Sequence, residues 1–288
     1  MPTGSTMSKF EELRFSWNRL GETDPYWAVL SHRQKKGNRW DPEEFFATGR
    51  DEIDGVMRDL TALELDFPRR RALDFGCGVG RLSQALVQHF ESVDGVDVSR
   101  SMLRLAEEHN RAGDRCRYHL NERRDLSLFD DGCFDFIYSN ITLQHIPPDL
   151  SKGYLRELLR VTAPGGVLVF QLAERHRFIA DARTPLGRAL GTLRWAGWLM
   201  LRRLYLWWRV RIRREPQMQI YGVTRGQVEG IVHQAGATLV DVQENDSAGP
   251  DWTSARYCVA TPASGACLPK RRRMTRAAAP PSQAAVGE

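Results

Sequence analysis

A turn rich in glycine is the feature that most constrains how this chain folds. In the stretch LDFGCGVGR, a short apolar run at 72–75 comes directly before Gly76, Gly78 and Gly80, and apolar residues at helical spacing follow from Leu82. Such a strand–turn–helix unit brings bare backbone and the free N–H groups of a helix start close to a bound ligand. The stretch therefore predicts an α/β protein that binds a ligand at this turn.

Further strands alternate with helical segments along the chain. The expected strands are apolar or alternating runs at 72–75, 92–98, 116–120, 134–140, 167–172, 237–243 and 255–261. Helical spacing separates most of them, which favours a parallel sheet covered by helices on both faces. No helix separates the last two strands, so we expect them to pair antiparallel at one edge.

The segments before and after this core differ from it in composition. A capping box at Ser8 to Glu11 starts one helix, Asp41 and Pro42 start another, and apolar residues from Ile53 to Leu63 mark a further one. The expected parts are a helical cap at 1–68, a core at 69–173, a helical insertion at 174–216, completion of the sheet at 217–262 and a disordered basic tail at 263–288.

Two acidic residues indicate what the glycine turn binds. Asp74 stands two residues before Gly76, where a carboxylate repels a pyrophosphate but attracts an ammonium group. Asp97 ends the second strand, where a carboxylate can accept both hydroxyls of a ribose. The glycine spacing is G-x-G-x-G and not the G-x-G-x-x-G of dinucleotide sites. A ligand with a ribose, an amine and a carboxylate fits these residues, and S-adenosylmethionine has all three.

Four motifs in order resemble one family. LDFGCGVGR, GVDVS, FDFIYSNITLQHI and RVTAPGGVLVF look like the successive motifs of the Rossmann-like (class I) S-adenosylmethionine-dependent methyltransferases, in the branch that acts on small molecules and lipids. The resemblance covers about 69–173 and, more weakly, 217–262. It implies a seven-stranded, mostly parallel sheet in the order 3-2-1-4-5-7-6 with the last strand antiparallel.

The resemblance also implies roles for individual residues. The methionyl end of the cofactor is expected beside Asp74, Gly76, Cys77, Gly78 and Gly80, the ribose at Asp97, and the adenine beside Val98, Met102 and Leu126. An acid after the third strand often meets the adenine amino group in this family. The stretch here, HLNERRDL, offers Asn121 and Glu122 and no single match. Asn140 to His145 are expected along the route from the sulfonium to the acceptor.

His145 is the candidate catalytic residue. It follows the fourth strand, at the edge of the sheet that faces the ligand. If the acceptor is a hydroxyl, a base must take its proton, and a histidine with a pKa near ~6.5 suits that task. The alternative is a histidine that hydrogen-bonds backbone in the turn before Pro147, or that walls the cofactor.

The insertion combines tryptophan with arginine. Residues 175–214 hold eleven arginines and one acid, and four of the eight tryptophans lie in 193–214. This segment is interpreted as a lid over the acceptor, as a contact with an anionic membrane surface, or as an RNA-binding surface. At the N-terminus, Trp40, Phe45, Phe46 and Arg50 either close over the site or pack as ordinary helix residues.

The sequence therefore predicts a methyltransferase for a small, amphiphilic or lipid-linked acceptor, with O-methylation slightly preferred. The alternatives are an RNA methyltransferase and a catalytically silent cofactor-binding module at a membrane or partner. We expect no metal site, because the five cysteines form no C-x-x-C pair and lack metal-ligand spacing with the histidines. We see no signal peptide or long apolar run, and expect a cytoplasmic protein, peripheral to the inner face of the membrane if 193–214 binds it. Nucleic acid is not the expected substrate, and the sequence gives no indication of oligomeric state.

Overall fold

The computed structural model describes residues 7–177, 200–201 and 215–263. Within them lies one seven-stranded sheet in the order β3-β2-β1-β4-β5-β7-β6. The strands are β1 (Arg71–Phe75), β2 (Ser92–Asp97), β3 (Cys116–Leu120), β4 (Phe134–Ser139), β5 (Thr162–His176), β6 (Thr238–Asn245) and β7 (Trp252–Ala260). β7 runs antiparallel to both neighbours and the other pairs are parallel, which confirms the predicted order and the antiparallel edge.

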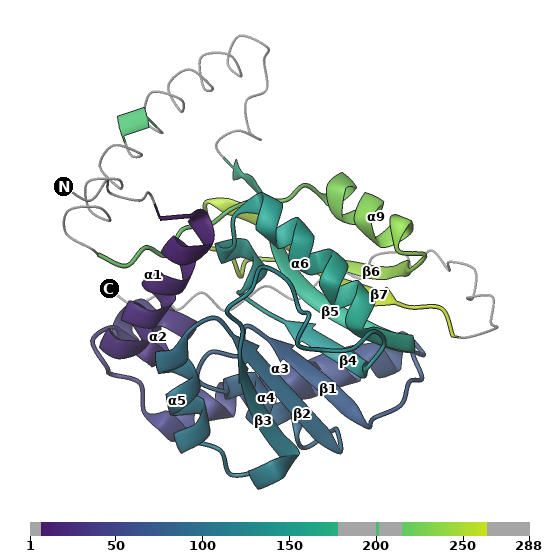
Figure 1. Cartoon of the computed structure of the whole chain (residues 1–288), viewed down its shortest axis with the longest axis horizontal. Helices are drawn as coiled ribbons and strands as arrows, with labels where there is room; N and C mark the ends of the chain where they lie inside the picture. Colours follow the sequence, from purple (N-terminus) through teal and green to yellow (C-terminus); the bar gives the residue numbers. More distant parts are fainter. Residues whose placement is uncertain (1–6, 178–199, 202–214, 264–288) are drawn as a thin grey trace, which may run out of the picture.

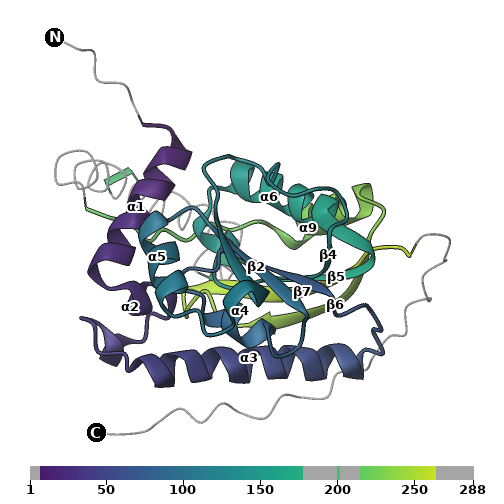
Figure 2. The ribbon, with the colours of Figure 1, turned by 60° about the horizontal axis from the view of Figure 1, so that its bottom comes forward.

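Helices cover both faces of the sheet (Figures 1 and 2). The helices are α1 (Lys9–Thr23), α2 (Pro25–Val29), α3 (Pro42–Ala62), α4 (Arg81–Leu86), α5 (Arg100–Glu108), α6 (Pro148–Val161) and α9 (Arg225–Gln234), with short 3₁₀ turns η1 (Arg33–Lys35), η2 (Gly113–Arg115) and η3 (Leu143–His145). In Figure 2, α3 runs along one side of the sheet while α6 and α9 lie on the other.

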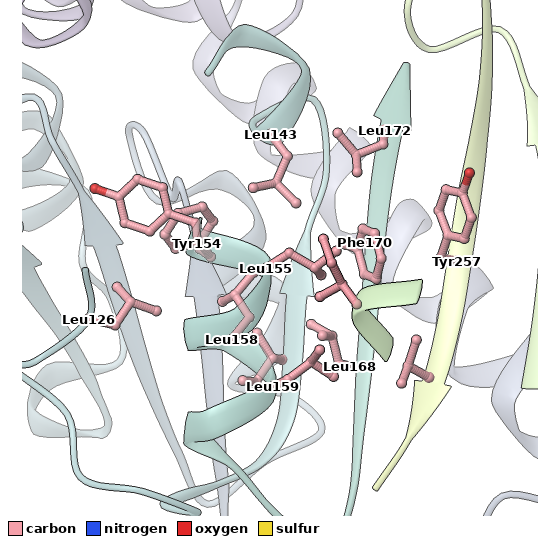
Figure 3. Packing of buried hydrophobic residues seen from close by; sticks show 14 of the residues in the cluster. Leu126, Leu143, Tyr154, Leu155, Leu158, Leu159, Leu168, Phe170, Leu172 and Tyr257 are labelled. Carbon is pink, nitrogen blue, oxygen red and sulfur yellow. The ribbon is translucent and has the colours of Figure 1, made fainter. Parts of the chain in front are cut away.

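The two faces of the central strands bury alternate residues. Leu73 and Phe75 of β1 pack on the side of α6 and α9, whereas Ala72 packs on the side of α3 and α4. Figure 3 shows the first of these cores, in which the apolar face of α6 lies against Leu168 and Phe170 of β5. Such burial contributes about 1.5–3 kcal/mol per large apolar side chain and fixes the strands whose ends form the site.

One expected pair of N-terminal helices is a single helix. The prediction separated a helix that starts at Asp41 from one at 53–63, but α3 is continuous over 21 residues. Gly49 lies in its middle, where a Cβ would stand 2.5 Å from the carbonyl oxygen of Arg81. The glycine therefore marks a close approach of α3 to the start of α4, and does not end the helix.

The expected insertion at 174–216 and the tail at 263–288 fall almost entirely outside the described residues, as does nearly all of 193–214. In the described part of the chain, no helix is long and apolar enough to cross a membrane.

Candidate functional site

The glycine turn connects β1 to α4 in a shape that only glycine adopts without strain. Gly76, Gly78 and Gly80 have φ values of +79°, +53° and +82°. A Cβ on Gly76 would lie 2.1 Å from the side chain of Thr142. A Cβ on Gly80 would lie 2.4 Å from the hydroxyl of Tyr118. Gly76 therefore lets the loop after β4 approach the turn, and Gly80 makes room for β3.

Asp97 ends β2 beside this turn, as predicted. One of its carboxylate oxygens accepts a hydrogen bond from the Gly78 N–H at 2.9 Å, and the other from the Ser99 N–H at 2.8 Å. Burial raises the pKa of Asp97, and these backbone bonds oppose the rise. Each oxygen keeps a further lone pair, so the carboxylate can accept hydroxyl groups from a ligand.

A cavity opens at this end of the sheet, beside the glycine turn and the end of β2. Ten of the predicted site residues line it: Gly76, Cys77, Gly78, Asp97, Val98, Met102, Asn121, Asn140, Ile141 and Thr142. The other lining residues are Leu13, Trp17, Ala28, Val29, Phe75, Arg81, Leu82, Val96, Ile146 and Tyr154.

Two buried charged groups at the turn each hold one atom without a hydrogen-bond partner among the described residues. Asp74 accepts a bond of 2.6 Å from Ser83 at Oδ2, and its Oδ1 has no partner. Arg81, 3% exposed, leaves its Nε–H unpartnered. Burial raises the pKa of Asp74 to about 7, opposed by the Ser83 hydrogen bond and the Arg81 charge. An orphan acceptor and an orphan donor at one turn complement a ligand with both an ammonium and a carboxylate group.

Four of the predicted binding residues do not line the cavity. Asp74 is buried near the end of β1 and is not among the lining residues, and Gly80 faces Tyr118 as described above. Glu122 is half-exposed and pairs with Arg14 at 2.5 Å. Leu126 is fully buried in the core near α6. Of the two candidates after β3, Asn121 is therefore the one at the cavity.

His145 also lies outside the cavity wall, in a continuous chain of hydrogen bonds from Gln171 to Gln219. Gln171 donates to the Gln144 oxygen at 2.9 Å, the Gln144 amide donates to His145 Nε2 at 3.2 Å, and His145 Nδ1 donates to the Gln219 carbonyl at 2.7 Å. Desolvation lowers the pKa of His145 to about 4, which the Gln219 bond opposes. The imidazole is therefore neutral near pH 7, and both of its nitrogens are occupied.

The loop after β4 is strained where it borders the cavity. Ile141 has a φ of +56°, between the lining residues Asn140 and Thr142. A β-branched residue in this left-handed region is disfavoured by roughly 1–2 kcal/mol. The surrounding contacts therefore impose this conformation on the loop, as is frequent at ligand sites.

The N-terminal helices supply a wall that the sequence did not indicate. Leu13 and Trp17 of α1, with Ala28 and Val29 of α2, line the cavity. Their spacing in the sequence is that of ordinary helix packing, so no signal distinguished them. Of the residues considered for closing over the site, Trp40 and Phe45 do not line the cavity but are buried in the cluster that holds the lining residues Ala28 and Met102. Phe46 and Arg50 border another hollow, against α4.

Cys77 and the other described cysteines are free thiols. Burial raises the pKa of Cys77 well above its ordinary value, so the thiol stays neutral and its small size suits the turn. In the ranges that the structure describes, no group of three or more histidine, cysteine or acidic side chains is arranged to hold a metal.

Comparison with known proteins identifies the core. Residues 72–166 match the model of a family described as a methyltransferase domain, which confirms the resemblance seen in the motifs. A ubiquinone biosynthesis O-methyltransferase of Ralstonia nicotianae is 29% identical over 157 residues, 54% of this chain and 62% of that protein. A trans-aconitate 2-methyltransferase of Deinococcus radiodurans is 31% identical over 137 residues, 48% of this chain and 50% of that protein. The chain thus covers less than two thirds of the length of these relatives.

Solved structures share the fold. The magnesium protoporphyrin IX methyltransferase of Synechocystis, crystallised with bound SAH, superposes with a TM-score of 0.58 at 17% sequence identity. The match covers 88% of this chain and 100% of the other. The likeness therefore extends beyond the residues that match the family model.

Proposed function

We propose that this chain, whose residues 72–166 match the model of a methyltransferase domain, transfers a methyl group from S-adenosylmethionine to a small-molecule acceptor. The observation that carries the proposal is the pair of unpartnered buried atoms, Asp74 Oδ1 and Arg81 Nε, at the glycine turn. A carboxylate acceptor and a guanidinium donor match the ammonium and the carboxylate of the methionyl group. The names of the relatives support the same activity.

The rest of the cofactor follows from the cavity wall. Asp97 would accept the ribose hydroxyls while its backbone bonds hold it in place. Val98 and Met102 would flank the adenine. Asn121 would border its polar edge, with its side-chain amide held by the backbone of Arg123 and Asp125. Asn121 is preferred over Glu122 because Glu122 is paired with Arg14 away from the cavity.

S-adenosylmethionine bound there would supply a methyl group on a positively charged sulfur, and the sulfur would keep the electron pair of the broken sulfur–carbon bond. The acceptor atom would form the new bond to carbon and, if it is a hydroxyl, would lose its proton to water. The task of the protein in such an in-line displacement is alignment. Asn140, Ile141 and Thr142 border the cavity and would set the direction of approach.

The acceptor is proposed to be apolar in the part that enters the cavity. Leu13, Trp17, Val29 and Ile146 give this wall an apolar surface. An amphiphilic or lipid-linked molecule fits such a wall, and O-methylation stays the preferred chemistry because one relative is named as an O-methyltransferase. Contact of 193–214 with a membrane remains a prediction.

His145 is proposed to position the chain around the site. Its lone pair accepts from Gln144, and its low pKa makes it a weak base. Its ring lies edge-on to Trp17, at 5.3 Å between centroids, and its Nδ1 holds Gln219. A base role, one of the two expectations from the sequence, would require this chain of bonds to open.

Calorimetry with the purified full chain tests the cofactor assignment. We expect uptake of S-adenosylmethionine and of SAH, and binding about 10-fold or more weaker in Asp97→Asn, because the amide has one acceptor oxygen in place of two and loses charge. Asp114→Asn, in η2, is the matched control. No uptake of either ligand by the parent protein would overturn the proposal.

Transfer of labelled methyl tests the acceptor class. Label in an organic-soluble product of a cell extract supports the proposal. Label in total RNA supports the RNA alternative instead, and binding with no turnover on any extract supports the silent module.

A further inference from the structure

Glu52 lies in α3, outside the residues that match the family model and outside the cavity wall. Its two carboxylate oxygens nevertheless hold the side chains of residues that line the cavity. Oε1 accepts from the Asn140 amide at 2.7 Å, and Oε2 accepts from Arg81 Nη2 at 2.8 Å. Oε1 also accepts from the hydroxyl of Tyr138, which is buried in β4, at 2.9 Å.

The same face of α3 is built around Arg81. Thr48, one turn before Glu52, accepts from Arg81 Nη1 at 3.3 Å. Gly49 lets the helix backbone approach Arg81 so closely that a Cβ would lie 2.9 Å from Arg81 Cγ. Both terminal nitrogens of the guanidinium are thus directed to α3, and only Nε is left without a partner in the described part of the chain.

A buried guanidinium needs such a partner. Arg81 is 3% exposed, and an uncompensated charge at this depth is strongly unfavourable. The ion pair with Glu52 neutralises the Arg81 charge. The plane of the guanidinium is fixed because its terminal nitrogens are bound to Thr48 and Glu52. The orientation of the free Nε–H then follows from where α3 stands.

We infer that Glu52 is a positioning residue, which holds Arg81 and Asn140 in the orientation that receives the methionyl end and the methyl group of the donor. The inference rests on the proposed function. It adds that a helix outside the matched domain determines the geometry of the site through a single carboxylate.

The first test is the affinity for SAH, measured by calorimetry on the full chain. Glu52→Gln keeps the shape of the side chain but removes its negative charge, so that Arg81 faces either an amide donor or a neutral oxygen. We expect binding weaker by roughly 10-fold or more. Asp54→Asn, which removes an exposed carboxylate paired with His89 two residues along the same helix, should leave it unchanged.

A double-mutant cycle separates positioning from general damage. If Glu52 acts through Arg81, Glu52→Gln in an Arg81→Met background should weaken SAH binding by much less than it does alone. Equal effects in both backgrounds would overturn the inference for Arg81.

The pH dependence of binding supplies a readout that a packing role would not move. Glu52 is one of the charges that raise the pKa of Asp74, together with Asp97, whereas Arg81 lowers it. The other titratable groups that interact with Asp74 are Cys77 and Cys116, both neutral thiols near pH 7. Glu52→Gln should therefore lower the pKa of Asp74. As a result, SAH binding should begin to weaken at a lower pH in this variant than in the parent protein.

The outcomes are distinguishable. A parent protein that binds neither S-adenosylmethionine nor SAH removes the proposed function, and this inference with it. A parent that binds and a Glu52→Gln variant that binds equally well overturn the inference alone. If Glu52→Gln does not fold, Glu52→Asp carries the test, because it keeps the charge but withdraws it from Arg81 and Asn140, and unchanged affinity there would again overturn it.

Discussion

At the scale of single residues, the site depends on groups whose charge is controlled by burial. Asp74 has a pKa of about 7 because it is desolvated, although the Ser83 hydroxyl donates to it. Its second oxygen has no partner among the described residues. A cation that binds there would favour the ionised carboxylate and lower that pKa.

Uptake of S-adenosylmethionine should therefore release a proton. Below about pH 7 the carboxyl of the free protein is mostly protonated, and pairing with an ammonium group drives the proton off. Calorimetry in buffers of different ionisation enthalpy should detect release approaching one proton near pH 6, and affinity should rise with pH up to about 7. Asp74→Asn should bind more weakly without this proton release. Identical heats in all buffers for the parent protein would contradict the assignment.

The sequence was informative about residues in the motifs and silent about the others. Spacing alone placed Asp97 and the glycines together, because the end of a strand and a tight turn are local features of the sequence. Glu52 is 29 residues from Arg81 in the chain, and nothing in its helix distinguishes it from a solvated acid. The environment of His145 depends equally on Gln219, which is 74 residues away.

At the scale of elements, the position of α3 relative to α4 matters most. Gly49 brings the two backbones together, and Thr48 and Glu52 bind Arg81 on the same helix face. Sequence reasoning divided α3 because the start signal at Asp41 and Pro42 and the apolar spacing from Ile53 to Leu63 were interpreted as two separate helices. Close contact with another backbone is a tertiary effect that one segment does not show.

Gly49→Ala should destabilise the protein although alanine favours helix. Its methyl group would overlap the Arg81 carbonyl, so α3 must shift, with a loss of roughly 1–3 kcal/mol in the free energy of unfolding. Gly55→Ala in the same helix meets nothing but the far end of Arg58, and should stabilise by about 0.5–1 kcal/mol. Urea denaturation of the two variants measures the difference, and equal stabilities would show that the approach of α3 to α4 is loose.

At the scale of the whole molecule, the alternation of strands and helices predicted the seven strands and the antiparallel pairing of the last two, and the family resemblance supplied their order. The alternation did so because buried parallel strands read as short apolar runs, whose spacing is local information. The wall formed by α1 and α2 depends on contacts between segments far apart in the sequence, and it was not predicted.

Two buried groups should give the stability of the protein opposite dependences on pH. His145 has a pKa of about 4 against an ordinary 6.5, so acid protonates the unfolded chain first and removes roughly 3 kcal/mol of stability as pH falls through that window. Asp74 has a pKa of about 7 against 3.8, so rising pH ionises the unfolded chain first and removes roughly 4 kcal/mol.

Substitution of either group should leave the pH dependence of stability that the other group causes. Between about pH 4.5 and 6.5, unfolding free energies should fall with pH in His145→Gln relative to the parent, and rise with pH in Asp74→Asn relative to the parent. Urea denaturation over this range measures both slopes. Parallel pH profiles for the three proteins would contradict the buried, uncharged state of His145 and the raised pKa of Asp74.

The contacts that hold α1 in the wall of the cavity have a consequence for biosynthesis. Ser16 in α1 accepts a hydrogen bond from the N–H of Gln217, 201 residues later, and Asn18 binds the start of α5. On the ribosome, the first helix emerges long before the last of these docking partners. A nascent chain therefore cannot complete the contacts that hold α1 beside the glycine turn until Gln217 has emerged, long after the turn itself.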